Sequence, residues 1–144
     1  MSSKTYKCHV LVKGKASGEA LFSRQAFSFD RAVDPRTGVV ADSRSGMAGA
    51  NIRGNVLFYT RGKGSTAGSS WLLEAIRLGN GPAAIVTEHA DLAAVVGASV
   101  AGILYGKAIP VLSGIDAQIF WKARGKTKSV ASVDGSAARV VLTG

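Results

Sequence analysis

The chain has 144 residues, 47% of them hydrophobic and 19% charged, which suits one globular domain over residues 1–144 and excludes a disordered chain. Its net charge of +9 is compatible with binding of nucleic acid, an acidic partner or an anionic substrate, and also with a role only in keeping the protein soluble. With one cysteine, Cys8, and two histidines, the chain alone cannot form a disulfide, a zinc site or an iron–sulfur site, and we expect a reducing cytoplasm.

The first third of the chain predicts short strands and turns. The first seven residues lack the apolar core of a signal peptide. Two strands are expected over Cys8–Val12 and Glu19–Phe22, joined by a turn over Gly14–Gly18. The turn signal Val-Asp-Pro-Arg-Thr-Gly follows at Val33–Gly38, and the glycine-rich segment Asp42–Gly54 is expected to be a loop.

The middle of the chain predicts strands that alternate with helices. In chain order the expected elements are a strand over Asn55–Tyr59, a helix over Thr66–Leu78, a strand over Ala83–Val86, a helix over Asp91–Ser99, and strands over Gly102–Leu104 and Ile109–Ser113. This order favours parallel strands with right-handed crossovers. Ligands bind such sheets outside the carboxyl ends of the strands.

The C-terminal part predicts three further strands, over Gln118–Arg124, Ser129–Val133 and Arg139–Leu142. The basic run Lys122–Lys128 lies between two of them and is expected to be a hairpin loop. The fold class is therefore α/β, with a central parallel βαβα core and strand-rich flanks.

A glycine-rich loop with two cations and four hydroxyls follows the strand Asn55–Tyr59. It reads Arg-Gly-Lys-Gly-Ser-Thr-Ala-Gly-Ser-Ser from Arg61 to Ser70. Such a loop directs backbone N–H groups and the positive end of a helix at one point, which suits a carboxylate or a phosphate. The spacing fits neither a Walker A loop, because Gly64 follows Lys63, nor the dinucleotide-binding fingerprint.

Ser65 has two interpretations at this stage. As the residue before the predicted helix, Ser65 or Thr66 can simply cap the helix N-terminus. Alternatively, Ser65 can act as a base, because its alkoxide would be stabilised by the helix dipole, backbone N–H groups and Lys63.

Other candidate residues have weaker signals. His9 lies in an alternating strand and His89 is remote from it in sequence, so an ordinary surface or core role is favoured for both. Asp34 fits a turn acceptor better than an active-site group. Glu88 and Asp91 frame His89, and they fit a helix cap better than a metal site.

Several segments together resemble a known family. These are Lys15–Leu21, Phe29–Gly38, Gly62–Ser69, Gly81–Val86 and Ile109–Val111, which run in the family's order through most of the chain. They are similar to the small subunit of aconitase X. The resemblance implies a swivelling β/β/α domain that closes over a large subunit, and it places an iron–sulfur cluster on that subunit and no metal on this chain.

The resemblance also implies a function in dehydration, a hydro-lyase reaction. Ser65 corresponds to the family's proposed proton acceptor, and Gly62, Lys63, Gly64 and Thr66 would bind the substrate. No nucleic acid or membrane partner is expected.

The resemblance implies either of two substrates. We expect a small hydroxy acid, cis-3-hydroxy-L-proline or a related acid, with mevalonate 5-phosphate as the alternative. A non-catalytic anion-binding module is a further alternative, and a basic nucleic-acid-binding domain is disfavoured because no aromatic residues cluster on a basic strand. Family members often have Gly-Gly where this chain has Arg31-Ala32, which bears on specificity.

Overall fold

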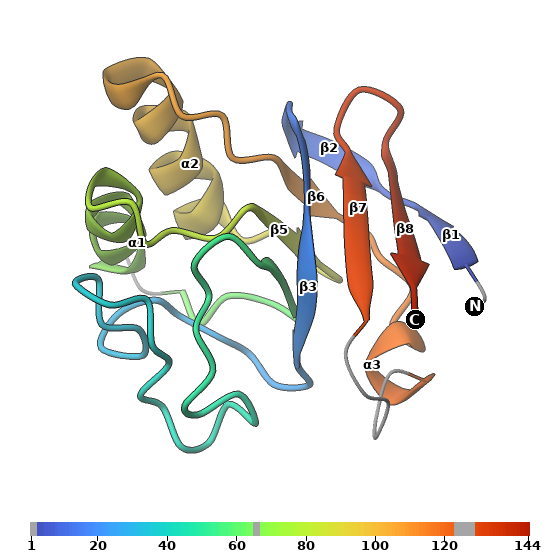
Figure 1. The fold of residues 1–144 in the computed structure, drawn as a ribbon, viewed down its shortest axis with the longest axis horizontal. Coiled ribbons are helices and arrows are strands. Elements are labelled where there is room, and N and C mark those ends of the chain that lie inside the picture. The colour runs from blue at the N-terminus through green and yellow to red at the C-terminus, as the bar shows by residue number, and fades with distance from the viewer. Residues whose placement is uncertain (1–2, 65–66, 123–128) are drawn as a thin grey trace.

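Residues 3–64, 67–122 and 129–144, the part that the computed structural model describes, form eight β-strands and three α-helices (Figure 1). The strands are β1 Ser3–Lys7, β2 His9–Val12, β3 Lys15–Ser23, β4 Val56–Tyr59, β5 Ala84–Thr87, β6 Val111–Ser113, β7 Val130–Asp134 and β8 Arg139–Thr143. The helices are α1 Ala67–Arg77, α2 Leu92–Tyr105 and α3 Ile119–Lys122. In these residues no helix has both the length and the apolar character needed to cross a membrane.

The strands hydrogen-bond in the order β1-β8-β7-β3-β4-β5-β6-β2. β4, β5 and β6 run parallel, as the alternation of strands and helices predicted, and β3 joins them as a fourth parallel strand. The long strand β3 joins two sheets, since Lys15–Glu19 pairs with β7 and Ala20–Ser23 pairs with β4. Figure 1 shows α1 and α2 on one side of β5 and β6, and β7 and β8 on the other. The α/β prediction and its parallel βαβ core are thus confirmed.

The central strands are buried on both faces, and their side chains alternate between two apolar clusters. One, the β/β core, lies between the two sheets and includes Val56, Phe58, Val86, Leu112, Ala131, Val133 and Val140. The other, the β/α core, lies toward the helices and includes Phe27, Phe29, Ile52, Leu57, Tyr59, Leu72, Ile76, Ile85 and Val111. Three layers in the order sheet, sheet, helices follow from this alternation.

The predicted hairpin near the N-terminus is wrong. β2 pairs antiparallel with β6 and not with β3, and residues 15–18 belong to β3 instead of a turn. Residue 18 of that strand is a glycine because a Cβ there would be only 2.4 Å from the carbonyl oxygen of Gly54. The glycine indicates a close approach of two backbone segments, not a turn.

Two further strand predictions are wrong because the described residues of each segment include a helix. Gly102–Leu104 belongs to α2, which continues until Gly106 adopts a left-handed conformation with φ 65° and caps it. Gln118–Arg124 contains α3, whose adjacent residues Ile119 and Phe120 are both buried, which a half-exposed strand would not allow. The basic segment 123–128 lies outside the described residues.

Candidate functional site

The loops after β4 and β5 lie side by side at the carboxyl ends of two neighbouring parallel strands. Tyr59 and Thr87 are register partners, so both strands end at the same level. The N–H of His89 donates to the carbonyl of Thr60 at 2.9 Å, which continues the pairing beyond the strands. The glycine-rich loop is therefore placed where parallel α/β sheets bind ligands.

The segment after β3 supports the loop from its other side. Phe27 bridges to Gly62, and its N–H donates to the carbonyl of Arg61 at 2.9 Å. Beneath the loop Phe27, Phe29 and Tyr59 form an aromatic cluster, with ring centroids 5.4–6.4 Å apart and almost no exposed surface. Aromatic contacts of this kind hold the base of the loop rigidly.

Asp91 links three parts of the site. One carboxylate oxygen accepts a hydrogen bond from the buried Tyr59 hydroxyl at 2.5 Å, and the other accepts from the N–H of Ala93 at 3.1 Å, as an N-cap of α2. Burial, followed by the Asp91 charge, raises the pKa of Tyr59 well above its usual range. Tyr59 therefore remains a hydrogen-bond donor to Asp91.

Gly62 packs directly on this carboxylate. A Cβ at Gly62 would lie 2.5 Å from Oδ1 and 2.6 Å from Cγ of Asp91. In a ligand-binding loop, a glycine commonly lets the backbone approach the ligand closely. At Gly62 the close neighbour is instead a buried side chain of the protein itself, and the capping role of Asp91 was predicted whereas this contact was not.

The opposite side of the loop carries charges. Lys63 Nζ lies 3.6 Å from Oδ2 of Asp42, and Arg44 Nε lies 3.7 Å from Oδ1 of the same residue. The N–H of Arg44 and the charges of Lys63 and Arg44 lower the pKa of Asp42 despite its partial burial. A pocket of about 330 Å³ adjoins this group and is lined by Ser28, Asp30, Arg31, Ala32, Asp42, Arg44 and Lys63.

Arg31 adopts an unusual backbone conformation in this pocket. Its φ is +61°, in the left-handed region that favours glycine. The arginine side chain is 88% exposed, and its Nε lies 3.8 Å from Asp30. A glycine would fit this backbone more easily, so the chain keeps a strained arginine beside the site.

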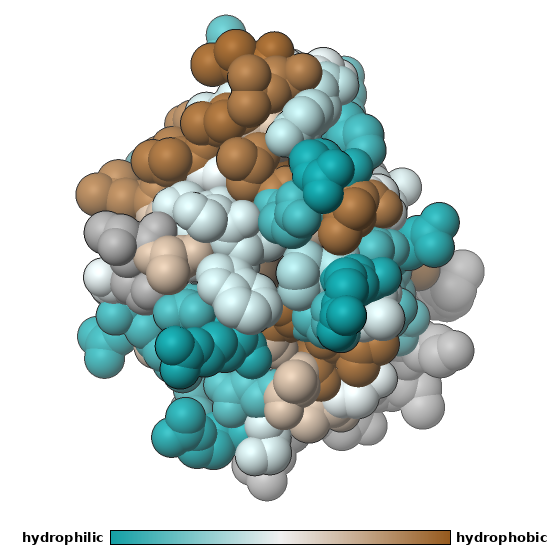
Figure 2. Space-filling view, turned by 90° about the vertical axis from the view of Figure 1, so that its left-hand side faces the viewer, coloured by the Kyte–Doolittle hydropathy of each residue, from teal (hydrophilic) through white to brown (hydrophobic). Residues whose placement is uncertain are grey.

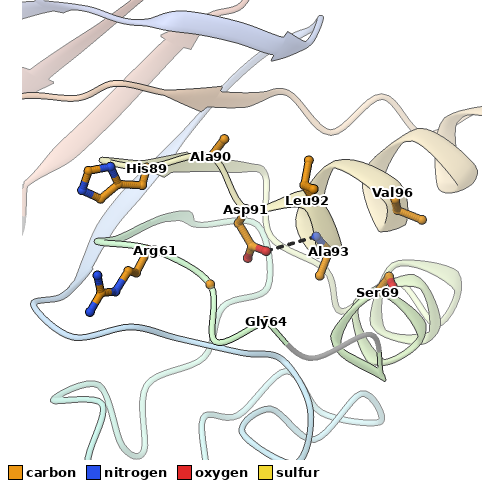
Figure 3. A pocket seen from close by; sticks show the side chains of 10 residues that line it. Arg61, Gly64, Ser69, His89, Ala90, Asp91, Leu92, Ala93 and Val96 are labelled. Atoms are coloured by element: carbon orange, nitrogen blue, oxygen red, sulfur yellow. Dashed lines mark hydrogen bonds between the residues drawn. The ribbon is translucent and has the colours of Figure 1, made fainter.

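A larger pocket of about 700 Å³ opens between the loop and α2 (Figure 3). Its lining residues are Arg61, Gly62, Gly64, Ser69, His89, Ala90, Asp91, Leu92, Ala93 and Val96. Figure 3 draws Arg61 and His89 toward one end of the pocket and Val96 and Ser69 toward the other. The pocket thus joins the polar loop to the apolar start of α2.

Comparison with known proteins decides the family. The aconitase X swivel domain family matches residues 5–142. The chain belongs to this family.

Individual proteins similar to this chain support the family assignment. The chain is 43% identical over 106 residues to the phosphomevalonate dehydratase small subunit of Pyrococcus furiosus, which covers 74% of this chain and 75% of that protein. It is 42% identical over 101 residues to cis-3-hydroxy-L-proline dehydratase of Pseudomonas aeruginosa, covering 70% of this chain and 17% of that protein. Both relatives are named dehydratases, which confirms the prediction of a hydro-lyase subunit.

A solved aconitase X structure confirms the fold. The crystal structure of Thermococcus kodakaraensis aconitase X in its holo-form superposes with a TM-score of 0.83 at 33% identity. The match covers 98% of this chain and 99% of that chain. The expectation of a swivel-type β/β/α domain is therefore confirmed.

The predicted site residues of this aconitase X domain are only partly described. Gly62 and Gly64 line the larger pocket, and Lys63 lines the smaller one. Ser65 and Thr66 lie outside the described residues, so the catalytic role of Ser65 and the binding role of Thr66 stay predictions. Gly64 has φ +73°, and a Cβ there would meet open space.

The residues with weaker signals in the sequence, Asp34, His9 and His89, lie at turn or surface positions. Asp34 is a turn acceptor, as predicted: its carboxylate accepts from the N–H of Arg36 at 2.9 Å, which lowers its pKa. His9 is exposed on β2, far from the loop in the sheet order. His89 is 65% exposed at the pocket rim, where Glu88 lies 3.7 Å away. In the described residues no three His, Cys, Asp or Glu side chains form a group suited to a metal.

Proposed function

We propose that this chain is the small subunit of an aconitase X-type hydro-lyase, which dehydrates a small hydroxy acid together with a large subunit. Family membership and the names of the relatives support this proposal. The main structural support is the position of the Arg61–Gly64 loop at the carboxyl ends of β4 and β5. This loop lines a pocket of about 700 Å³.

Both substrates in the relatives' names share one chemical pattern. Each is a carboxylate with a hydroxyl on the β-carbon and a removable proton on the α-carbon. Removing that proton leaves an electron pair that forms the double bond as the C–O bond breaks, and the departing hydroxyl takes up a proton to leave as water. The developing negative charge spreads onto the carboxylate, so the enzyme must place cationic or N–H donors there.

In this proposal each loop residue has a role in that reaction. Ser65 accepts the α-proton, and Lys63 with the N–H groups near Gly64 and Thr66 binds the carboxylate. The start of α1 at Ala67 supports the charge requirement, because an alkoxide at residue 65 would precede a helix N-terminus. The large subunit would hold the iron–sulfur cluster and the leaving-group chemistry.

The substrate expected from the sequence is cis-3-hydroxy-L-proline, with one carboxylate and a ring ammonium. The second candidate is mevalonate 5-phosphate, and one observation favours it. The pocket beside Lys63 holds three cations, Arg31, Arg44 and Lys63, against the two carboxylates of Asp30 and Asp42. A net positive pocket next to the loop suits a second anionic group better than an ammonium.

The test is a dehydration assay of the complex with both substrates and with Ser65→Ala. Turnover should fall by about a hundredfold or more, because a positioned base contributes rate factors of that size. Ser70→Ala is the matched control, since it removes the same hydroxyl from an exposed position on α1. Near-normal turnover of Ser65→Ala would remove Ser65 from the mechanism, and no turnover of either substrate by the native complex would refute the proposed reaction.

A further inference from the structure

The helix α2 is unusual in composition for a surface helix. None of its fourteen residues, Leu92–Tyr105, is charged, although 19% of the whole chain is. One face is small and packs inward through Ala94, Gly97, Ala98 and Ala101. At Gly97 the packing against α1 is so close that a Cβ would lie 3.0 Å from the Leu72 side chain. This inner face accounts for the small residues of α2 but not for its large ones.

Four large apolar side chains of α2 point away from the protein. Leu92, Val96 and Ile103 are 75%, 52% and 82% exposed, and their spacing of four and seven residues places them in one stripe along the helix. Leu104 beside them is 61% exposed. We call these four residues the α2 stripe. Figure 2 shows a brown band that descends from the top of the molecule, where α2 lies in Figure 1.

The neighbouring helix α1 shows what an ordinary solvent-facing helix of this domain looks like. Its outer side carries Glu74 and Arg77, which form a two-point ion pair at 2.6 and 2.9 Å. A surface helix normally presents charged and polar groups to water, and a contiguous apolar patch marks an interaction site. The α2 stripe therefore indicates a partner that covers it.

The α2 stripe is continuous with the candidate site. Leu92 and Val96 belong to the stripe and also line the larger pocket, together with Gly62 and Gly64 of the loop. A partner that covers the pocket to complete an active site must therefore approach the face that carries the stripe. A polypeptide seated there would exclude water from the pocket and bury the stripe in one contact.

We propose that the α2 stripe is the docking surface for the large subunit, which contacts it through an apolar patch of its own. This inference rests on the proposed function, because that function supplies the partner. In the Pseudomonas aeruginosa relative the matched segment is 17% of the protein, so a domain of this family is found attached to a much larger polypeptide. A fully buried, apolar centre is typical of protein–protein interfaces, and a few residues there carry most of the binding energy.

The test compares two substitutions of exposed apolar residues by lysine. Ile103→Lys places a cation in the last turn of α2, where the helix dipole favours it, so the domain should fold normally. Val130→Lys is the matched control: Val130 is 53% exposed on β7, away from α2, and lies opposite Glu19. Binding of each variant to the purified large subunit is measured by titration, and thermal unfolding of each is recorded.

We expect Ile103→Lys to weaken binding at least about tenfold, while Val130→Lys binds like the native chain. If Ile103→Lys unfolds at a lower temperature, Ile103→Ala, which keeps high helix propensity, should still weaken binding. Native affinity of a folded Ile103 variant would overturn the proposal. Self-association of the native chain that Ile103→Lys abolishes, with unchanged affinity for the large subunit, would also overturn it in favour of a second copy.

The assay of the native complex separates this proposal from the proposed function. Loss of binding by Ile103→Lys with no turnover of either hydroxy acid by the native complex would support the docking surface and refute the reaction. Normal turnover by the native complex, together with native affinity of Ile103→Lys, would support the reaction and refute the docking surface.

Discussion

The loop between β4 and α1 has two sides that are held in different ways. On one side Gly62 presses on the buried carboxylate of Asp91, which two hydrogen bonds fix in place. On the other side Lys63 and Arg44 share the partly exposed Asp42 through ion pairs longer than 3.5 Å. Burial therefore sets the position of the loop, whereas the weakly held charges are free to exchange their partner for a ligand.

The largest effect is expected on the buried side, from Gly62→Ala. The new methyl would overlap the Asp91 carboxylate, which cannot move without losing a hydrogen bond, so stability should fall by about 1–3 kcal/mol. Gly102→Ala is the control, because its Cβ would meet only the Lys107 carbonyl at 4.0 Å within a helix. It should raise stability by up to about 1 kcal/mol. Denaturant titration of both variants measures this, and equal effects would contradict the tight contact at Gly62.

An intermediate effect is expected on the charged side, from Arg31→Gly. Relief of the left-handed backbone at φ +61° should stabilise the domain by about 1 kcal/mol. Ala138→Gly, at φ +55° in the turn before β8, should stabilise it by a similar amount. Only Arg31→Gly removes a cation from the pocket beside Lys63, so it alone should raise KM for an anionic substrate. A change in KM for both variants would show that the kinetic effect is not local.

The smallest effect is expected from the Asp42 charge. Its pKa is lowered in the folded chain, so the stabilisation it provides is present above the ordinary aspartate pKa of about 3.9 and is lost as pH falls through the folded value. Asp42→Asn should therefore flatten the acid limb of the stability curve, with an effect of about 1 kcal/mol or less at neutral pH.

Asp134 provides a comparison for Asp42. Its pKa is lowered chiefly by the N–H groups of Ala137 and Ser136 in the turn before β8. Asp134→Asn should flatten the acid limb in the same direction. Asp42→Asn alone should lower KM for an anionic substrate, because it releases Lys63. Equal kinetics for the two variants would show that Lys63 does not bind the substrate.

The parts of the fold that sequence reasoning predicted share one property, a local pattern strong enough to decide the structure. The apolar run of β4 and the helical period of α1 between clear stop signals are examples. The strand β1 was not predicted, because among its polar residues only Tyr6 is buried. It is a strand because β8 pairs with it, and that information lies more than 130 residues away.

The candidate site also has features that local sequence patterns predicted and features that they did not. The position of the loop followed from strand order, and the cap role of Asp91 followed from its place before a helix. The contact of Asp91 with Gly62 and Tyr59 joins two strand ends, and no spacing along the chain encodes it. The conformation of Arg31 was likewise not predicted, although the Gly-Gly pair that the resemblance implies at the position of Arg31-Ala32 is a signal that could have indicated it.

The position of β1 has a consequence for how the chain folds. Ser3 and Thr143 are register partners, and their hydroxyl oxygens lie 3.3 Å apart, so the first strand of the chain pairs with the last. During synthesis β1 cannot form this pairing until Arg139–Thr143 has been synthesised. Contacts of such long sequence separation form late and slow the folding of a domain. A circular permutant with its ends joined and new ends opened in the exposed turn near Gly49 should fold faster, because the pairing of β1 with β8 would then become local.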